Sequence, residues 1–373
     1  MSPGGSADGA APLDRAKPVR AGEELPVEPL AAWLARELPD FVSGAAELTV
    51  EQFPGGHSNL TYLLRSGDRE LVLRRPPHGS TVRTAHDMGR EHRVLSRLAT
   101  VYPKAPRALA ACPDPAVIGA PFYVMERVRG IILRHPRPPR GVALTPEVMR
   151  HLSQAAVDGL AELHAVSPEA AGLADLGRPD GYAARQVAGW GERWQKARTE
   201  EMAEVERAFA WLAGQPPPPP SGPPALLHND YKYDNLVLAP DLQAIVAVLD
   251  WEMATLGEPL LDLGTSLGYW MDPDDDPELL LLPTGPTTLP GGLSRAEVVE
   301  RYAARSGRDV SGILFAFVYG LLKIAVIAQQ IYFRYAQGLT RDERFAQLPR
   351  GIRVLGRAAA QAIDKGRIDR LMA

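Results

Sequence analysis

The chain has 373 residues, a formal net charge of −4 and a hydrophobic content of 45%. That apolar content supports a folded core and excludes a wholly disordered chain, although 34 glycines and 35 prolines exceed the usual share of about 12%. The length predicts about two domains, and the charge excludes a broad basic surface, so we expect no nucleic-acid partner. One cysteine, Cys112, excludes an intramolecular disulfide and fits a reducing compartment.

The first 22 residues are rich in Ser, Gly, Ala and Pro and contain no apolar run of the kind found in signal peptides. We interpret residues 1–22 as a disordered leader. The only membrane-like run, Gly312–Ala328, carries Lys323 at its middle, where a charge is costly in lipid. We therefore interpret the run as a buried helix, and we expect a cytoplasmic protein with no membrane partner.

Short strands and one helix dominate the chain up to about residue 130. Two strand-forming runs, at 59–65 and 70–74, are separated by Ser-Gly-Asp-Arg, which predicts a hairpin. Apolar periodicity predicts a helix over 85–99, and a further strand is predicted over 121–125. We assign residues 23–128 to an N-terminal lobe.

Beyond that boundary the chain becomes mostly helical, and we assign residues 129–373 to a second lobe. A second hairpin is predicted from two strand-forming runs that flank the turn Pro-Asp-Leu-Gln. The predicted fold class is α+β, with a small strand-rich lobe and a larger helical lobe. The helices are predicted over 146–166, 182–213, 295–306 and 313–337, and the hairpin strands over 236–238 and 245–249.

Polar residues with the spacing H-x-D-x-x-x-x-N stand just before this second hairpin. They are His228, Asp230 and Asn235. Protein kinases have the same spacing in the catalytic loop, where the Asp accepts the substrate hydroxyl proton and the Asn binds Mg²⁺. Asp250 ends the second hairpin strand, and an antiparallel return brings it to the same end as Asn235. Two oxygen donors there suit a hard cation that keeps water and phosphate oxygens as its other ligands.

A cationic side chain on a strand and an acid on the following helix form the other part of a kinase site. Arg74 ends a predicted strand, and Glu91 lies on the apolar face of the predicted helix, where an acid needs a partner. We predict that Arg74 pairs with Glu91, and a purely structural ion pair is the alternative. Arg75 is a weaker candidate because successive strand residues point to opposite faces.

Two further segments occupy positions that suit nucleotide binding. Gly55, Gly56 and Ser58 lie in a turn where small residues would let the backbone approach phosphates. Glu126 and Val128 lie in the linker between the lobes, where backbone groups would meet an adenine base.

Seven motifs together resemble the aminoglycoside phosphotransferase and choline kinase-like enzymes, which have a two-lobed, protein-kinase-like fold. More narrowly, the chain is similar to the branch whose members are fused to, or associated with, acyl-CoA dehydrogenases. The motifs cover about residues 45–340. They are LVLRRPP at 71–77, REHRVL at 90–95, FYVMERVRG at 122–130, LAELHAV at 160–166, HNDYKYDNL at 228–236, VLDWEMATLGEPLLDL at 248–263 and IAVIAQQIY at 324–332.

The resemblance implies a role for each matching residue, with ATP and Mg²⁺ as cofactors. Asp230 would be the catalytic base, His228 would brace the loop, and Asn235 and Asp250 would bind Mg²⁺. Arg74 stands where many relatives have Lys, which keeps the charge and adds donors. The phosphate acceptor would be a hydroxyl of a small molecule. Members of this branch are implicated in phosphorylating hydroxyacyl-CoA compounds and hydroxy acids. A functional link to an acyl-CoA dehydrogenase is also implied.

Asn229 departs from the family, which usually has Gly before the catalytic Asp, and this leaves a non-catalytic, pseudokinase-type protein as an alternative. A third reading keeps the kinase and makes the acceptor an aminoglycoside or amino alcohol. Such cationic acceptors need acidic surroundings, and the acidic segment 272–276 is predicted to be a solvated loop. Lys323 is expected either to make a structural pair or to line the acceptor cleft.

Overall fold

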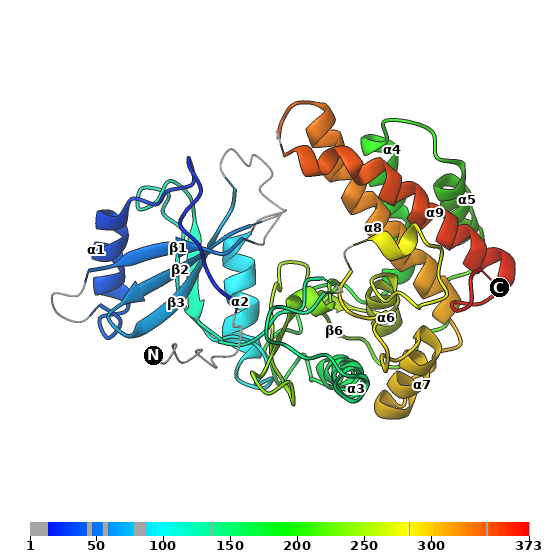
Figure 1. The fold of residues 1–373 in the computed structure, drawn as a ribbon, viewed down its shortest axis with the longest axis horizontal. Helices are drawn as coiled ribbons and strands as arrows, with labels where there is room; N and C mark the ends of the chain where they lie inside the picture. The colour runs from blue at the N-terminus through cyan, green and yellow to red at the C-terminus, as the bar shows by residue number, and fades with distance from the viewer. Residues whose placement is uncertain are drawn as a thin grey trace, which may run out of the picture.

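The computed structural model describes residues 14–42, 47–54, 59–77, 87–135, 137–282, 284–340 and 342–372. It has two lobes, a sheet flanked by two helices and a larger helical body (Figure 1). The predicted α+β class is therefore confirmed. The elements of the first lobe are α1 (Val27–Glu37), β1 (Thr49–Gln52), β2 (Leu60–Ser66), β3 (Arg69–Arg75), α2 (Met88–Leu98), β4 (Ala108–Cys112) and β5 (Phe122–Glu126).

The strands of the first lobe form one antiparallel sheet in the order β1-β2-β3-β5-β4. The predicted hairpin is β2–β3, in which Thr61 lies opposite Arg74. Side chains alternate along β3: Leu71 and Leu73 pack with α1, whereas Val72 packs with α2 on the other face. This alternation directs Arg74 to the α2 face. Helix α2 begins at Asp87, whose side chain accepts a hydrogen bond from the backbone N–H of Arg90.

Residues 14–22 correct the prediction of a disordered leader for the part of that segment that the structure describes. Lys17 forms an antiparallel bridge with Gln52 of β1. Asp14 donates its backbone N–H to Gly130 O and accepts hydrogen bonds from Arg134 through its carboxylate. Sequence composition missed this because backbone hydrogen bonds and an ion pair with distant residues hold the segment, without an apolar pattern of its own.

The second lobe combines long helices with two short strand pairs, β6–β9 and β7–β8, and turns. Its core helix α8 packs against α4, α6 and α9 (Figure 1). The elements are α3 (Pro146–His164), α4 (Tyr182–Ala197), α5 (Ala203–Gly214), β6 (Ala225–Leu227), β7 (Leu236–Leu238), β8 (Ile245–Val248), β9 (Thr255–Gly257), α6 (Pro259–Gly268), α7 (Arg295–Ser306), α8 (Ile313–Ala336) and α9 (Leu348–Lys365), with 3₁₀ turns at Tyr233–Asn235, Leu279–Leu281 and Glu343–Gln347.

The predicted helix over 182–213 is wrong in one respect, because it is two helices, α4 and α5. Helix α4 ends at Ala197, whose free carbonyl accepts a hydrogen bond from the side chain of Gln329 on α8. That acceptor would otherwise be left unpaired at a helix end. The predicted helices over 295–306 and 313–337 and the hairpin β7–β8 are present.

Helices α6 and α8 cross closely through two glycines. A Cβ on Gly264 would lie 2.1 Å from Ala316 O, and one on Gly320 would lie 2.1 Å from Gly264 O. The close approach explains why this segment of α6 contains glycine within a helix despite its low helix propensity. Within the described residues, α8 is the one helix long and apolar enough to cross a membrane. Two thirds of its apolar window (67%) is buried inside the protein, as in a core helix.

Candidate active site

The loop 228–235 connects two strand pairs and holds the expected catalytic residues. It follows β6, which pairs with β9, and it leads into the hairpin β7–β8. The hairpin continues past its strands, because Leu249 donates its backbone N–H to Asn235 O at 2.8 Å. Asn235 and Asp250 therefore come to the same end of the hairpin, as the sequence predicts.

The side chain of Asn235 is bound to that of Asp230. Its Nδ2 donates to Asp230 Oδ2 at 3.0 Å and to Asp230 O at 2.8 Å. Lys232 approaches the same carboxylate, with Nζ 3.1 Å from Oδ2, and lies over the ring of Tyr269. Burial alone would lower the pKa of Lys232, but the charge of Asp230 raises it above its ordinary value. Asp230 thus lies between the amide of Asn235 and the ammonium of Lys232. Sequence reasoning did not single out Lys232.

His228 braces this loop as a neutral imidazole. Its Nδ1 accepts the backbone N–H of Asp230 at 3.2 Å, and its Nε2 donates to Leu249 O at 2.9 Å. The protonation pattern follows from the partners, because an N–H can only donate and a carbonyl can only accept. Burial lowers the pKa of His228, which favours the same neutral form. His228 therefore joins the loop 228–235 to the strand that leads to Asp250.

Arg74 connects the two lobes at the site. Its Nη1 donates to Glu91 Oε1 at 2.5 Å and its Nη2 donates to Asp250 Oδ1 at 3.0 Å. Burial raises the pKa of Asp250, but the Arg74 guanidinium outweighs burial and holds that pKa below its ordinary value. Arg75 lies on the opposite face and donates to Ile118 O. The structure thus brings together Arg74, Glu91 and Asp250.

Helix α2 is held against the segment that follows Asp250 by further contacts. Glu91 Oε1 also accepts the backbone N–H of Trp251 at 3.2 Å. Arg90 donates to the carbonyls of Glu252 and Ala254. The acid that orients Arg74 is therefore fixed relative to the second lobe as well as to its own helix.

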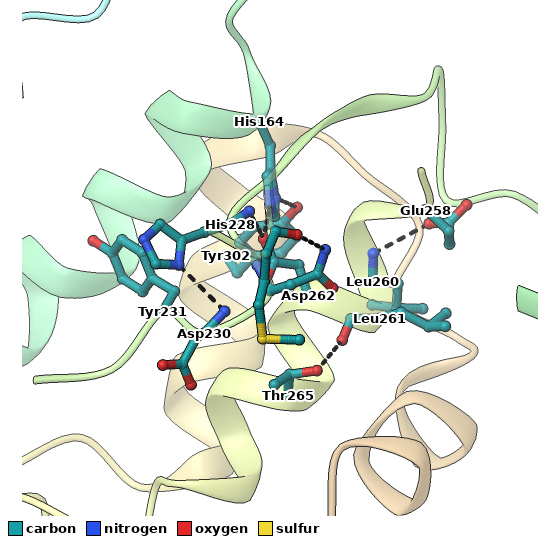
Figure 2. A network of polar contacts seen from close by, with 12 residues as sticks. His164, His228, Asp230, Tyr231, Glu258, Leu260, Leu261, Asp262, Thr265 and Tyr302 are labelled. Atoms are coloured by element: carbon teal, nitrogen blue, oxygen red, sulfur yellow. Dashed lines mark hydrogen bonds and ion pairs between the residues drawn. The ribbon is translucent and has the colours of Figure 1, made fainter. Parts of the chain in front are cut away.

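Behind the loop 228–235, the buried carboxylate of Asp262 on α6 fixes two consecutive backbone amides. It accepts the N–H of His228 at 2.7 Å and that of Asn229 at 2.8 Å. His164 approaches the same carboxylate (Figure 2), with its Nε2 3.2 Å from Oδ2, the oxygen that also accepts the His228 amide. Burial raises the pKa of Asp262, but the His164 hydrogen bond prevails and lowers it. The loop thus rests on an ionised acid inside the second lobe.

Asn229 adopts a left-handed backbone conformation, with φ of +66°. Asn tolerates this conformation better than most residues, and Gly tolerates it best. Its side chain makes three contacts: Tyr182 and Lys323 donate to Oδ1, and Nδ2 donates to Met253 O. The larger side chain is therefore accommodated at this position by specific partners.

The linker between the lobes lies beside an apolar cluster. Glu126 ends β5, and its carboxylate accepts hydrogen bonds from the backbone and side chain of Arg107. Val128 packs on Ile132, Val237 and Ala247, which continues the apolar surface from the linker to the hairpin β7–β8. Gly55, Gly56 and Ser58 lie outside the described residues.

The residues at the end of the hairpin fit a magnesium ion in the mode that kinases use. Because Nδ2 of Asn235 is committed to Asp230, its Oδ1 is the amide atom that can bind a cation. The Asp250 carboxylate would supply a second oxygen ligand, and phosphates and water normally complete such a set. Within the described ranges no three His, Cys, Asp or Glu residues cluster as a self-sufficient metal site.

Comparison with known proteins places this geometry in a family. The sequence profile of the Phosphotransferase enzyme family matches residues 49–305. The chain belongs to this family. Mouse (Mus musculus) acyl-CoA dehydrogenase family member 10 is 33% identical over 324 residues, which are 86% of this chain and 30% of that protein. Human (Homo sapiens) acyl-CoA dehydrogenase family member 11 is 32% identical over 320 residues, which are 84% of this chain and 40% of that protein.

Solved structures of other proteins have the same two-lobed fold as this chain. A Ralstonia eutropha protein named after the aminoglycoside phosphotransferases is 28% identical, with a TM-score of 0.72 over 91% of this chain and 99% of that one. A choline kinase from Cryptosporidium parvum is 13% identical, with a TM-score of 0.58 over 92% of this chain and 98% of that one, which shows the fold alone. The phosphotransferase chain spans about 30–40% of the length of the curated relatives it matches.

Sequence reasoning missed Asp262 and His164, which support the loop 228–235 from behind, and Arg90, which joins helix α2 to the segment after Asp250. Asp262 stands in the run Leu-Leu-Asp-Leu, and a lone acid among leucines is a signal that could have been used, since a buried carboxylate needs donors. His164 gave a weaker signal, because its two partners come from α6 and α7. Arg90 gave none, because its acceptors are backbone carbonyls more than 160 residues away.

Proposed function

We propose that this chain is an ATP- and Mg²⁺-dependent kinase that phosphorylates a hydroxyl of a small molecule. The observation that carries the proposal is the connected set of five side chains at the lobe junction. Glu91 holds Arg74, Arg74 reaches Asp250, and the hairpin brings Asp250 beside Asn235, which binds Asp230. A base, two oxygen ligands for a cation and a phosphate-binding cation therefore converge.

In the proposed reaction, the acceptor oxygen attacks the γ-phosphorus and its proton passes to Asp230. The bond from the γ-phosphorus to the bridging oxygen breaks, and ADP leaves with that oxygen. Arg74 binds the phosphates, and His228 fixes the backbone of the base. Mg²⁺ on Asn235 and Asp250 would neutralise phosphate charge. Catalysis then rests on positioning and electrostatics. The apolar surface at Val128 would receive adenine, with backbone groups from Glu126 to Val128 on its edge.

We favour a hydroxyacyl-CoA or hydroxy acid as the acceptor over an aminoglycoside or amino alcohol. The acidic segment 272–276 is not a solvated loop that is open to a cationic acceptor, so the prediction of a solvated loop is wrong. Asp272 and Asp275 are buried and pair with Arg295, and Asp276 pairs with Arg357. The cation Lys232 lies next to the base, which suits an anionic acceptor. The names of the curated relatives support the same substrate class and a functional link to an acyl-CoA dehydrogenase.

A screen of ATP consumption tests the proposal. Purified protein is incubated with ATP, Mg²⁺ and hydroxyacyl-CoAs, free hydroxy acids, amino alcohols or aminoglycosides, and ADP is measured. We expect turnover with a hydroxy compound and its loss in Asp230→Ala. The matched control is Asp241→Ala, in the exposed turn at the far end of the same hairpin, which should retain wild-type turnover. Equal turnover of Asp230→Ala and wild type would contradict the assignment of the base.

A thermal-shift titration separates the kinase from a non-catalytic protein. We expect ATP to raise the melting temperature more with Mg²⁺ than without it, because Asn235 and Asp250 bind the metal–nucleotide complex. The absence of any Mg²⁺-dependent shift would favour the pseudokinase-type alternative. We also propose a cytoplasmic location, where ATP and acyl-CoA compounds are available.

A further inference from the structure

Lys323 is a buried cation on the core helix α8, beneath the catalytic loop. Its side chain is among the largest that are fully buried, with a residue exposure of 1%. Burying an ammonium group in an apolar helix is costly unless polar groups receive it. Within the described residues, Lys323 makes no ion pair with a carboxylate. The contacts are hydrogen bonds to Asn229 and a position 5.9 Å from the centre of the Trp190 ring.

The strongest of these contacts is to the peptide that leads into Asp230. Lys323 Nζ donates to Asn229 O at 2.6 Å, and to Asn229 Oδ1 at 3.2 Å. The N–H of the same peptide belongs to Asp230 and donates to His228 Nδ1. One peptide unit is therefore held at both ends, by Lys323 at its carbonyl and by His228 at its amide.

The preceding residue makes this peptide sensitive to its partners. Asn229 has the left-handed backbone conformation, and the orientation of the next peptide depends on keeping it. Asp262 fixes the amide of Asn229 from α6, and Lys323 fixes its carbonyl from α8. If the carbonyl were released, Asp230 would be the first residue whose position changes.

We infer that Lys323 is a positioning residue of the proposed kinase, and that its ammonium group holds the 229–230 peptide so that Asp230 faces the acceptor hydroxyl. This inference rests on the proposed function. It assigns the apolar helix α8 a part in catalysis through one buried charge, without contact between Lys323 and a substrate. Lys323 thus faces a buried partner, as the sequence predicts for a lysine in an apolar run, and that partner is Asn229.

The charges around Lys323 give the contact a pH dependence. Burial lowers the pKa of Lys323 to about 8, against the opposing influence of Asp262 on α6 and Asp230 in the loop. Lys232 in the loop and Arg193 on α4 lower it further, and Tyr182 on α4 shares the Asn229 Oδ1 acceptor. The ammonium is therefore charged below about pH 8 and loses its proton above it. We expect kcat to fall as the pH rises through this value.

The free energy of unfolding, in contrast to kcat, should rise as the pH increases over this range. Between about pH 8 and 10.5 the unfolded chain keeps a proton on Lys323 that the folded chain has released. The free energy of unfolding therefore rises with pH in this window. A lysine that only stabilised the fold would not produce a falling kcat together with rising stability.

The test uses Lys323→Met, which keeps an unbranched stem as long as the lysine chain up to Cε and removes the ammonium with its charge and donors. We expect kcat to fall roughly 10-fold or more, with little change in the KM for ATP and with the alkaline loss of kcat near pH 8 absent. Hydrogen exchange in a peptide covering residues 228–235 should become faster. The matched control is Gln329→Leu on the same helix, whose contacts to Ala197 and Thr199 lie away from the loop. It should lower the melting temperature and leave kcat and loop exchange unchanged.

The outcomes separate this inference from the proposed function. If wild type turns over an acceptor, Asp230→Ala does not, and Lys323→Met matches wild type, the positioning role is overturned while the kinase stands. Faster loop exchange without a loss of kcat would also overturn it. If wild type turns over none of the acceptors, the proposed function fails, and unchanged exchange in Lys323→Met would then refute the contact itself.

Discussion

Asp262→Asn is the substitution for which the structure gives the most defined expectation. Asp262 is fully buried and its two oxygens receive three donors: the backbone amides of His228 and Asn229 and the ring of His164. An asparagine has one oxygen and one NH₂ group at the same positions. Because donors lie on both sides of the carboxylate, either orientation of the amide places an N–H against an N–H.

The cost can be worked from these contacts. The variant loses one hydrogen bond to a charged acceptor, about 1.5–3 kcal/mol, and leaves one buried donor unpaired, about 1–3 kcal/mol. The sum, about 2.5–6 kcal/mol, brackets the usual cost of about 3–5 kcal/mol for breaking a buried charged contact. At roughly 2–4 °C per kcal/mol for a lobe of this size, the melting temperature should fall by about 10 °C.

Calorimetry and urea denaturation of wild type and variant measure this loss. Asp158→Asn is the matched control, because Asp158 makes partly exposed ion pairs with Arg301 and Arg305 in the same lobe and should contribute only about 1 kcal/mol. The pKa of Asp262 is lowered, so its contribution is present above the unfolded value of about 3.9 and is lost as the pH falls through the lower folded value. A loss below about 1 kcal/mol, or equal losses in both variants, would refute the reasoning.

Two further predictions concern other buried charges. Arg74→Met should destabilise the protein by about 3–5 kcal/mol, because Glu91 is left buried without its cation, and should weaken ATP–Mg²⁺ binding in calorimetric titration. Arg75→Met on the opposite face should leave nucleotide affinity unchanged, and equal weakening in both variants would contradict the choice of Arg74. Burial raises the pKa of Asp272 to about 6, so stability falls as the pH rises from about 4 to 6. Asp272→Asn should remove that slope from melting temperatures measured across this range, and an unchanged slope would contradict the assignment.

The parts of the site that were predictable from the sequence are those set by local geometry. Asn235 and Asp250 come together because a short antiparallel hairpin joins them. The direction of Arg74 follows from the alternation along β3, and that of Glu91 follows from the periodicity of α2. Each of these inferences needed only the spacing of neighbouring residues within an element or a hairpin.

The remaining features depend on contacts between distant segments, which spacing does not contain. The break between α4 and α5 coincides with a hydrogen bond from Gln329, 132 residues away. The acidic segment 272–276 was expected in solvent, but Arg295 at the start of α7 draws Asp272 and Asp275 inside. Helix α6 was not predicted, because its glycines disfavour a helix until the approach of α8 is known.

Asn229 shows how a departure from the family pattern can be consistent with an intact catalytic loop. A glycine would adopt the left-handed conformation at less cost but would contribute no side chain. Asn229 instead connects its loop to α4 through Tyr182, to the segment after Asp250 through Met253, and to α8 through Lys323. These contacts offset the cost of the conformation and reduce the freedom of the peptide before Asp230. The residue that raised doubt about activity is therefore one of those that fix the proposed base.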